Sequence, residues 1–255
     1  PAYAGMFEAL VGERRRYLDV TLCQVDPVYC RALSRYNRVL VQRNALLRTL
    51  REGHGDEAEL SYWDEQLARL GATVLSRRLW AVQRLGQQGD RYQQALTGQE
   101  ETLCPRYVAS IDLPALSESE ILAPPDDEPL RAGLAAALRR VRRQELARGV
   151  TLLGPHRDDL RFFVNDVDMT IYGSRGQQRT VALALKLAEV AFIREQTGET
   201  PVLLLDDVIS ELDQRRGHFL LGAIGEAQQV FITTTTFANY PTDFIERAVR
   251  WRVSR

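Results

Sequence analysis

One short run, Val202-Leu203-Leu204-Leu205-Asp206-Asp207, constrains the fold of this chain more than any other feature. A continuous apolar run of this length predicts a buried strand in a parallel sheet that is covered on both faces. Such a strand would deliver the two carboxylates to the carboxyl edge of the sheet, where α/β proteins bind ligands. There Asp206 could hold Mg²⁺ through water, and Asp207 could orient or deprotonate an attacking water. Alternatively, the acids start a turn and cap the next helix.

The residues around this run predict an α/β arrangement from Val150 onward. Short apolar runs at 151–153, 160–164 and 169–172 alternate with turns, including one at Asn165-Asp166. The pattern then predicts a helix over 177–196, the strand at 201–206, a helix from about 213, and strands at 230–234 and 248–253. Because a strand, a helix and a second strand follow one another, we expect a parallel sheet.

The first half of the chain carries two apolar stripes at helical spacing. The first comprises Val28, Leu33, Tyr36, Val39, Leu40, Leu46, Leu47 and Leu50, and the second comprises Leu60, Trp63, Leu67, Leu70, Val74, Leu75, Leu79, Val82 and Leu85. Gly53-His54-Gly55 separates them, which suggests an antiparallel hairpin whose second helix spans about 60 Å. The hairpin is either part of a packed helical lobe or an extended rod. A linker is expected over 114–129, then a helix over 130–148 that Gly149 ends.

A glycine-flanked serine opens the helix that precedes the acidic strand. In the segment Tyr172-Gly-Ser-Arg-Gly-Gln-Gln-Arg-Thr180, the glycines let the backbone approach a ligand closely. The Ser174 hydroxyl and the free amides at the helix start could then bind an anion. The alternative is a serine N-cap with glycines that serve a tight turn. Ser210-Glu211-Leu212-Asp213, just after the acidic pair, likewise suits either a helix cap or a functional loop.

The order of these motifs resembles the C-terminal lobe of ABC-type ATPases, in which a signature motif, a Walker B strand and a D-loop follow one another. The details resemble the RecF branch of the SMC-like members of that family. The segments that carry the resemblance are ERRRYLD at 13–19, QRNALL at 42–47, GPHRDDL at 154–160, YGSRGQQRTVALALKLAE at 172–189 and PVLLLDDVISELD at 201–213. It therefore implies a fold of class α/β with a large all-helical domain. Residues 1–148 would form the helical lobe and residues 149–255 the C-terminal lobe of an ABC/SMC-type P-loop ATPase head.

The resemblance also implies roles for individual residues. Ser174 and Gly176 would contact the γ-phosphate of ATP held by a partner subunit, and Arg175 and Gln177 would also belong to the cofactor-binding residues. Asp213 would cross the dimer interface beside that nucleotide. Asp206 would serve Mg²⁺, and Asp207 would stand where most ABC ATPases place a catalytic Glu. Thr235 or a neighbour would replace the switch His that follows the next strand, which fits slow hydrolysis. His156, Arg157 and Asp158 receive no catalytic role.

The sequence contains no P-loop, which needs G-x-x-x-x-G-K-[ST]. Its only lysine, Lys186, lies in Leu183-Ala-Leu-Lys-Leu-Ala188, with no glycine nearby. The sequence also lacks an initiator Met, so we expect the numbering to begin inside a longer protein whose earlier segment carries the P-loop. ATP binding and weak ATPase activity are therefore expected of the intact protein and not of this chain alone.

Composition limits the class of partner. The net charge of −1 excludes a global basic field, so DNA binding must come from local patches such as Arg139, Arg140, Arg142 and Arg143, although these also suit a solvated helix face. Three cysteines without metal-ligand spacing suit a reduced, cytoplasmic protein, and no apolar run is long enough to cross a membrane.

The resemblance implies an ATP-dependent homodimer that binds single-stranded and double-stranded DNA at gaps and helps to load recombinase, with RecR and RecO as partners. The alternative is a remnant or fragment that binds DNA or partner proteins without ATP switching. A transporter ATPase subunit is a third, weaker interpretation.

Overall fold

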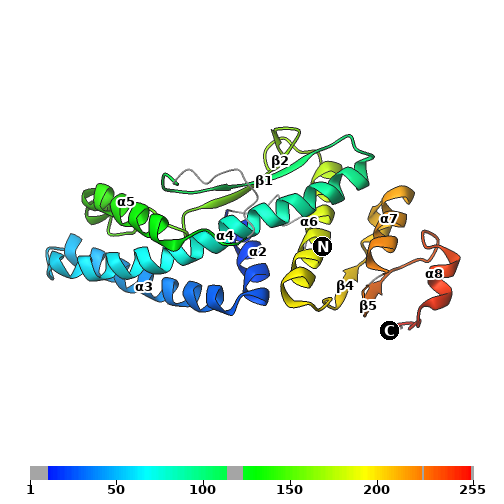
Figure 1. Ribbon diagram of the computed structural model, residues 1–255, viewed down its shortest axis with the longest axis horizontal. Helices are drawn as coiled ribbons and strands as arrows, with labels where there is room; N and C mark the ends of the chain where they lie inside the picture. Colours follow the sequence, from blue (N-terminus) through cyan, green and yellow to red (C-terminus); the bar gives the residue numbers. More distant parts are fainter. Residues whose placement is uncertain (1–10, 114–122, 226, 254–255) are drawn as a thin grey trace.

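The computed structural model describes residues 11–113, 123–225 and 227–253. Helices dominate, and two small sheets lie among them (Figure 1). The elements are α2 (Val11–Val25), α3 (Pro27–Arg51), η1 (Glu57–Glu59), α4 (Leu60–Thr97), β1 (Leu103–Val108), α5 (Asp127–Arg148), β2 (Asp159–Val164), β3 (Val167–Asp168), α6 (Arg175–Thr197), β4 (Leu203–Asp206), η2 (Ile209–Glu211), α7 (Gln214–Ile224), β5 (Val230–Thr233) and α8 (Thr242–Arg247). No helix in these ranges is long and apolar enough to cross a membrane.

The two long helices predicted in the first half are confirmed. Asp26 caps α3 by accepting hydrogen bonds from the amides of Val28 and Tyr29, and Pro27 occupies the first turn. α4 has 38 residues and therefore extends for about 57 Å. It packs along α3, α5 and α6, so it belongs to a packed lobe over most of its length (Figure 1).

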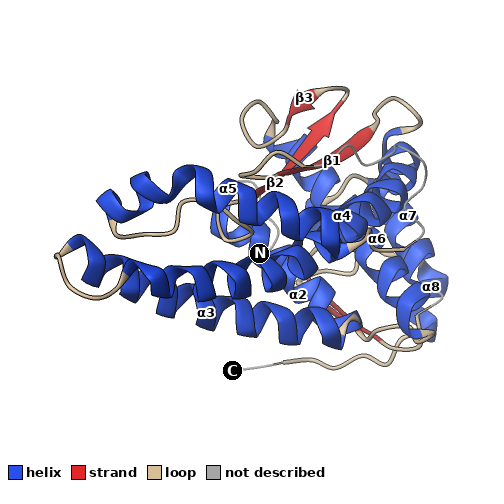
Figure 2. Cartoon of the chain, turned by 60° about the vertical axis from the view of Figure 1, so that its left-hand side comes forward, coloured by secondary structure: helices blue, strands red, loops and turns tan. Residues whose placement is uncertain are grey.

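The first half also contains a strand that the sequence reading missed. β1 pairs antiparallel with β2, and β3 completes a three-stranded sheet in the order β1-β2-β3 (Figure 2). β1 carries Pro105, which a strand tolerates when it lies at a sheet edge, as β1 does. The expectation of an all-helical first half is therefore wrong at this point.

The linker predicted over 114–129 can be compared with the structure only over its second half. Residues 114–122 lie outside the described residues, and α5 begins at Asp127, three residues earlier than expected. Gly149 ends α5 in the left-handed conformation, as predicted. Of the three apolar runs before α6, only 160–164 forms a strand, because the chain turns at 169–172 and is irregular at 151–153.

β4 and β5 form a separate two-stranded parallel sheet. Leu203 and Leu205 face the core, whereas Leu204 is 71% exposed and Phe231 is 40% exposed. The expected parallel pairing is confirmed, but the expected cover on both faces is wrong for the described part of the chain. The strand expected at 248–253 is also wrong, because these residues lie in irregular structure after α8.

One main core cluster joins the two halves of the chain. Leu18, Tyr36, Leu103, Phe192 and Leu220 all belong to it, although they come from five different elements. The ring of Trp80 on α4 packs against that of Phe192 on α6, with ring centroids 5.3 Å apart. The long helix α4 therefore links the helical region to the elements around the acidic strand.

The GPHRDDL segment is held by buried polar contacts to several elements. The Pro155 carbonyl accepts a hydrogen bond of 2.8 Å from Arg78, and His156 Nδ1 lies 2.7 Å from the Tyr36 hydroxyl. Asp158 accepts from the Tyr107 hydroxyl at 2.7 Å. Gly154 has φ +122°, and a Cβ there would lie 2.6 Å from the Tyr36 hydroxyl, so only glycine fits. These contacts give the segment a structural role.

Candidate functional site

The carboxyl edge of the β4–β5 sheet brings Asp206 beside Thr233. Because the strands are parallel, both carboxyl ends lie at one edge, and the register places Asp206 opposite Thr233. The Thr233 hydroxyl donates a hydrogen bond of 2.5 Å to Asp206 Oδ1. Both side chains are exposed on the open face of the sheet, so the carboxylate can still bind a ligand.

Asp207 holds an unusual backbone conformation directly after the strand. Its φ is +49°, in the left-handed region that Asp tolerates better than most residues. Its amide donates to the Thr233 carbonyl at 3.1 Å, and its own carbonyl accepts from the Ser210 hydroxyl at 2.8 Å. Asp207 Oδ1 is buried and has no hydrogen-bond partner among the described residues. An unsatisfied buried carboxylate oxygen of this kind suits a ligand or water.

Tyr240 lies close to Asp207, which the sequence reading missed. Burial is the main reason that the pKa of the Tyr240 hydroxyl is raised, and the negative charge of Asp207 raises it further. Within the described residues, that hydroxyl is also buried without a partner. Tyr240 stands 33 positions after Asp207, so no local motif could have paired them. Thr235, predicted to replace the switch His, is exposed in the loop after β5.

The N-terminus of α6 presents the second predicted group. Ser174 is the N-cap, and a capping box joins it to Gln177. Ser174, Arg175 and Gly176 are exposed, and a Cβ on Gly176 would meet nothing within 4 Å. By contrast, a Cβ on Gly173 would lie 2.7 Å from the Met169 carbonyl oxygen. Gly173 therefore serves the turn, whereas the surface over Gly176 is open to an approaching group.

The third predicted residue, Asp213, caps α7. It accepts a hydrogen bond of 3.0 Å from the Arg216 amide. It also lines a hollow of about 260 Å³ together with Thr97, Glu100, Glu101 and Arg215. No hydrogen bond or ion pair in the described ranges joins Asp213 or Ser174 to Asp206 or Asp207. The structure therefore shows three separate groups. Of the predicted residues it brings only Asp206 and Asp207 together, and Thr233 and Tyr240 lie beside them.

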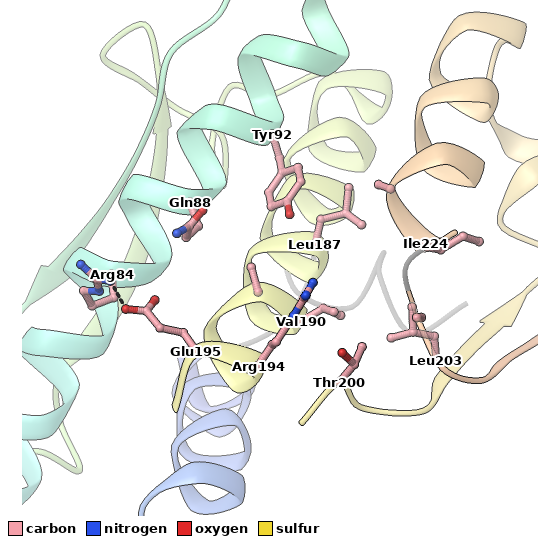
Figure 3. A pocket seen from close by; sticks show the side chains of 13 residues that line it. Arg84, Gln88, Tyr92, Leu187, Val190, Arg194, Glu195, Thr200, Leu203 and Ile224 are labelled. Carbon is pink, nitrogen blue, oxygen red and sulfur yellow. Dashed lines mark hydrogen bonds and ion pairs between the residues drawn. The ribbon is translucent and has the colours of Figure 1, made fainter. Parts of the chain in front are cut away.

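A larger hollow of about 540 Å³ does not coincide with these groups. It lies between α4, α6, β4 and α7, and Arg84 and Glu195 form an ion pair at its wall (Figure 3). Its β4 residue is Leu203, at the opposite end of the strand from Asp206. We therefore place the candidate site at the carboxyl edge and not in this hollow.

The residues at the edge fit a partial magnesium site. No cluster of three or more His, Cys, Asp or Glu side chains suitable for a metal occurs within the described ranges. Mg²⁺ needs fewer, because it usually binds one or two carboxylates and completes its shell with water and substrate phosphates. The exposed Asp206 carboxylate and the unpaired Asp207 Oδ1 meet that requirement.

Comparison with known proteins gives long, strong matches. A DNA replication and repair protein RecF from Chloroflexus aggregans is 48% identical over 246 residues, which cover 94% of this chain and 61% of the relative. RecF from Roseiflexus castenholzii is 42% identical, with 99% of this chain and 64% of the relative covered. The chain is a RecF homologue over the part that it spans. That part is about three fifths of the length of these RecF relatives.

Solved structures agree with this assignment. The structure described as the recombination mediator protein RecF-ATP in the RecFOR pathway superposes with a TM-score of 0.82 at 32% identity. It covers 93% of this chain and 61% of the RecF chain, and a second RecF structure gives a TM-score of 0.81. No protein-family model matches the chain. The mixed α/β, mostly helical fold is therefore that of part of RecF.

Proposed function

We propose that this chain provides the helical lobe and the C-terminal ATPase lobe of a RecF-type protein that acts in DNA repair and recombination. The observation that carries the proposal is the carboxyl edge of the β4–β5 sheet, where Asp206 is oriented by Thr233 and Asp207 keeps one carboxylate oxygen unpaired. The 48% identity to RecF over nearly the whole chain supports the same reading. Residues 1–148 would form the helical domain and residues 149–255 the C-terminal lobe.

In the intact protein, bound Mg-ATP would supply the phosphates and the metal charge. Asp206 would hold Mg²⁺ directly or through water, and Thr233 would fix the rotamer of Asp206. Asp207 would orient the attacking water. The Thr235 hydroxyl would lie near the phosphate, in the place of the switch His. An uncharged hydroxyl is a poor base, so slow hydrolysis suited to a switch is expected.

The remaining candidates would act across a homodimer. The amides and hydroxyl at the start of α6 suit a phosphate group, because a helix N-terminus carries partial positive charge. Ser174, Arg175, Gly176 and Gln177 would thus contact ATP held by the partner subunit, and Asp213 would lie beside it. The dimer would bind gapped DNA, with single- and double-stranded parts, and work with RecO and RecR to load recombinase.

The test uses the chain completed with the N-terminal segment of a RecF relative. We expect Asp206→Asn to lower kcat for ATP hydrolysis by at least about a hundredfold, because a metal ligand contributes several kcal/mol to the transition state. Thr233→Val should lower kcat less, since the carboxylate remains. Asp243→Asn, on exposed helix α8, is the control and should leave turnover unchanged. Full turnover in Asp206→Asn would contradict the assignment.

A second candidate function is DNA or partner binding without ATP switching. The observation that favours it is the position of Lys186, the only lysine in this sequence. Lys186 lies on α6 and pairs with Glu189 at 2.7 Å, so it is not a P-loop lysine that could bind the phosphates of ATP. DNA affinity of the completed protein, measured with and without Mg-ATP, separates the two. A change in affinity with nucleotide supports the ATP switch, and indifference to nucleotide supports the second function.

A further inference from the structure

Helix α3 has an unusual charge composition. It contains six arginines, at positions 31, 35, 38, 43, 48 and 51, and no Asp or Glu. The whole chain has a net charge of −1, so this helix is locally basic within a nearly neutral protein. Arg43 adds no exposed charge, because it is buried and pairs with Asp64 and Glu145.

Three of the other arginines form a stripe on the exposed side of α3. Arg31, Arg35 and Arg38 are spaced at i, i+4 and i+7, so they lie within about 60° of arc on the helix. All three are exposed, and within the described residues none forms a hydrogen bond or an ion pair. We call Arg31, Arg35 and Arg38 the α3 arginine stripe. Gln42, one turn further on, is also exposed and offers another donor.

The buried side of α3 fixes the direction of the stripe. Tyr29, Tyr36 and Leu47 are fully or almost fully buried, and the Arg43 guanidinium is locked between α4 and α5. The helix therefore cannot rotate to bring acids toward the stripe. The three positions span about 10.5 Å along the axis, at 1.5 Å per residue. Three base steps of one DNA strand cover a similar length, at about 3.4 Å each.

The arginines on α5 that sequence reasoning considered are less available. Arg142 forms ion pairs with Asp64 and Glu57, and Arg140 lies 3.4 Å from Asp112. Only Arg139 and Arg143 of that group are exposed without an ion pair in the described part of the chain. An arginine already paired with a carboxylate gains less from a phosphate, because the existing pair must first be broken.

We propose that the α3 arginine stripe binds the phosphate backbone of DNA. The inference rests on the proposed function, which supplies DNA as the partner, and it assigns the contact to one face of one helix. Guanidinium groups bind phosphate through paired N–H donors, and a row of them reads backbone charge rather than base sequence. Single-stranded and duplex DNA offer the same phosphate chemistry, so both are probes.

The experiment measures binding of the chain to fluorescent single-stranded and duplex oligonucleotides as a function of salt. The triple variant Arg31→Gln/Arg35→Gln/Arg38→Gln should bind at least about tenfold more weakly at low salt. Its slope of log K against log salt should fall by about 2 for single strands and about 2.7 for duplex. The form whose slope falls as expected identifies the DNA that the stripe contacts. Arg31→Lys/Arg35→Lys/Arg38→Lys keeps the charge and should retain most of the slope.

The matched control removes the same charge elsewhere. Arg139→Gln/Arg143→Gln/Arg148→Gln changes three exposed arginines of α5 and should change the slope much less than the α3 variant. Circular dichroism melting of each variant excludes unfolding as the cause. Equal losses for both triple variants would show a response to net charge alone and overturn the stripe. Unchanged binding in the α3 variant would contradict the role of the α3 arginine stripe but leave the proposed function standing. If the chain without substitutions binds no DNA, either by itself or joined to the N-terminal segment of a RecF relative, both proposals fail.

Discussion

At the scale of single residues, His156 is a measurable reporter of how the GPHRDDL segment is packed. Burial is the main reason that its pKa falls from 6.5 to about 4, and the nearby charges of Arg157, Arg15 and Arg43 lower it further. The folded protein therefore binds fewer protons than the unfolded chain between these two pH values. Stability should be highest above pH 6.5 and should decrease as the pH falls toward 4. The free energy of unfolding should fall by roughly 2 kcal/mol between pH 7 and pH 5.

Urea unfolding of the chain at several pH values checks this prediction. Carboxylates also titrate at the acid end, so the comparison is with His156→Asn, which has no titrating ring. The variant should be less stable at pH 7, because the contact with the Tyr36 hydroxyl changes. It should also lose less stability between pH 7 and pH 5. Identical pH profiles for the two proteins would show that His156 is protonated as easily in the folded state as in water.

The residues around Asp206 show how far sequence reasoning reaches at this scale. The apolar run ending in two acids predicted the strand and its exposed carboxyl end, because both follow from neighbouring residues. Thr233 and Tyr240 were not predicted as neighbours of the acids. They lie on a later strand and loop, and only the strand register places them there. Unsatisfied atoms such as Asp207 Oδ1 likewise become visible only in three dimensions.

At the scale of elements, Arg43 joins three parts of the helical region. Its guanidinium contacts Asp64 on α4 at 2.8 Å, Glu145 on α5 at 2.6 Å and the Thr151 hydroxyl at 2.8 Å. Arg43→Met should destabilise the chain by about 3–5 kcal/mol, because Glu145 would remain buried without a cation. Chemical denaturation measures the loss. The control Arg131→Gln removes an exposed ion pair with Glu128 and should change the stability far less, because solvent screens such pairs.

A second variant separates charge from packing in this network. Arg43→Met/Glu145→Gln removes the buried acid together with its cation and should recover part of the stability lost in Arg43→Met. Asp64 keeps a partner in both variants, because Arg142 also pairs with it. If the double variant is no more stable than the single one, the loss comes from packing of the long arginine side chain and not from an uncompensated charge.

The elements also show why periodicity alone could not give the sheets. Apolar stripes predicted α3, α4 and α6 well, since a helix satisfies its own backbone and its pattern is local. β1 was missed because Leu103–Val108 is a short edge strand whose partner, β2, lies more than 50 residues later. The strand expected at 248–253 had a suitable apolar pattern, but a strand forms only where a neighbour offers hydrogen bonds. The described structure offers none there.

At the scale of the whole molecule, the long helix α4 connects the arginine stripe region to the candidate nucleotide site. Its first turns lie beside α3 and α5, and its last turns lie beside α6 (Figure 1). Near its end, Gln93 donates a hydrogen bond of 2.6 Å to Glu101, and Glu101 also accepts one of 3.5 Å from Gln177 in the capping box. DNA bound on α3 and ATP bound across the proposed dimer would thus both contact elements that pack against α4.

The proposed dimer gives the last prediction, because the start of α6 is exposed and accessible to a second subunit. In the chain completed with a P-loop segment, Ser174→Arg should block ATP-dependent dimerisation and leave ATP binding by the monomer intact. The bulky cation would occupy the open surface over Gly176, where a phosphate of the partner's nucleotide is expected. Sedimentation velocity with and without Mg-ATP measures the dimer, and nucleotide titration measures binding.

Ser174→Ala is the matched variant, because it removes the N-cap hydroxyl without adding bulk and should cost about 1 kcal/mol of stability. It should weaken the dimer less than Ser174→Arg does. Normal dimerisation of Ser174→Arg would show that this helix start faces away from the partner subunit. The capping box uses the amides of Ser174 and Gln177 and leaves those of Arg175 and Gly176 outside it, so a dimer defect specific to the arginine variant would place this helix start at the subunit interface.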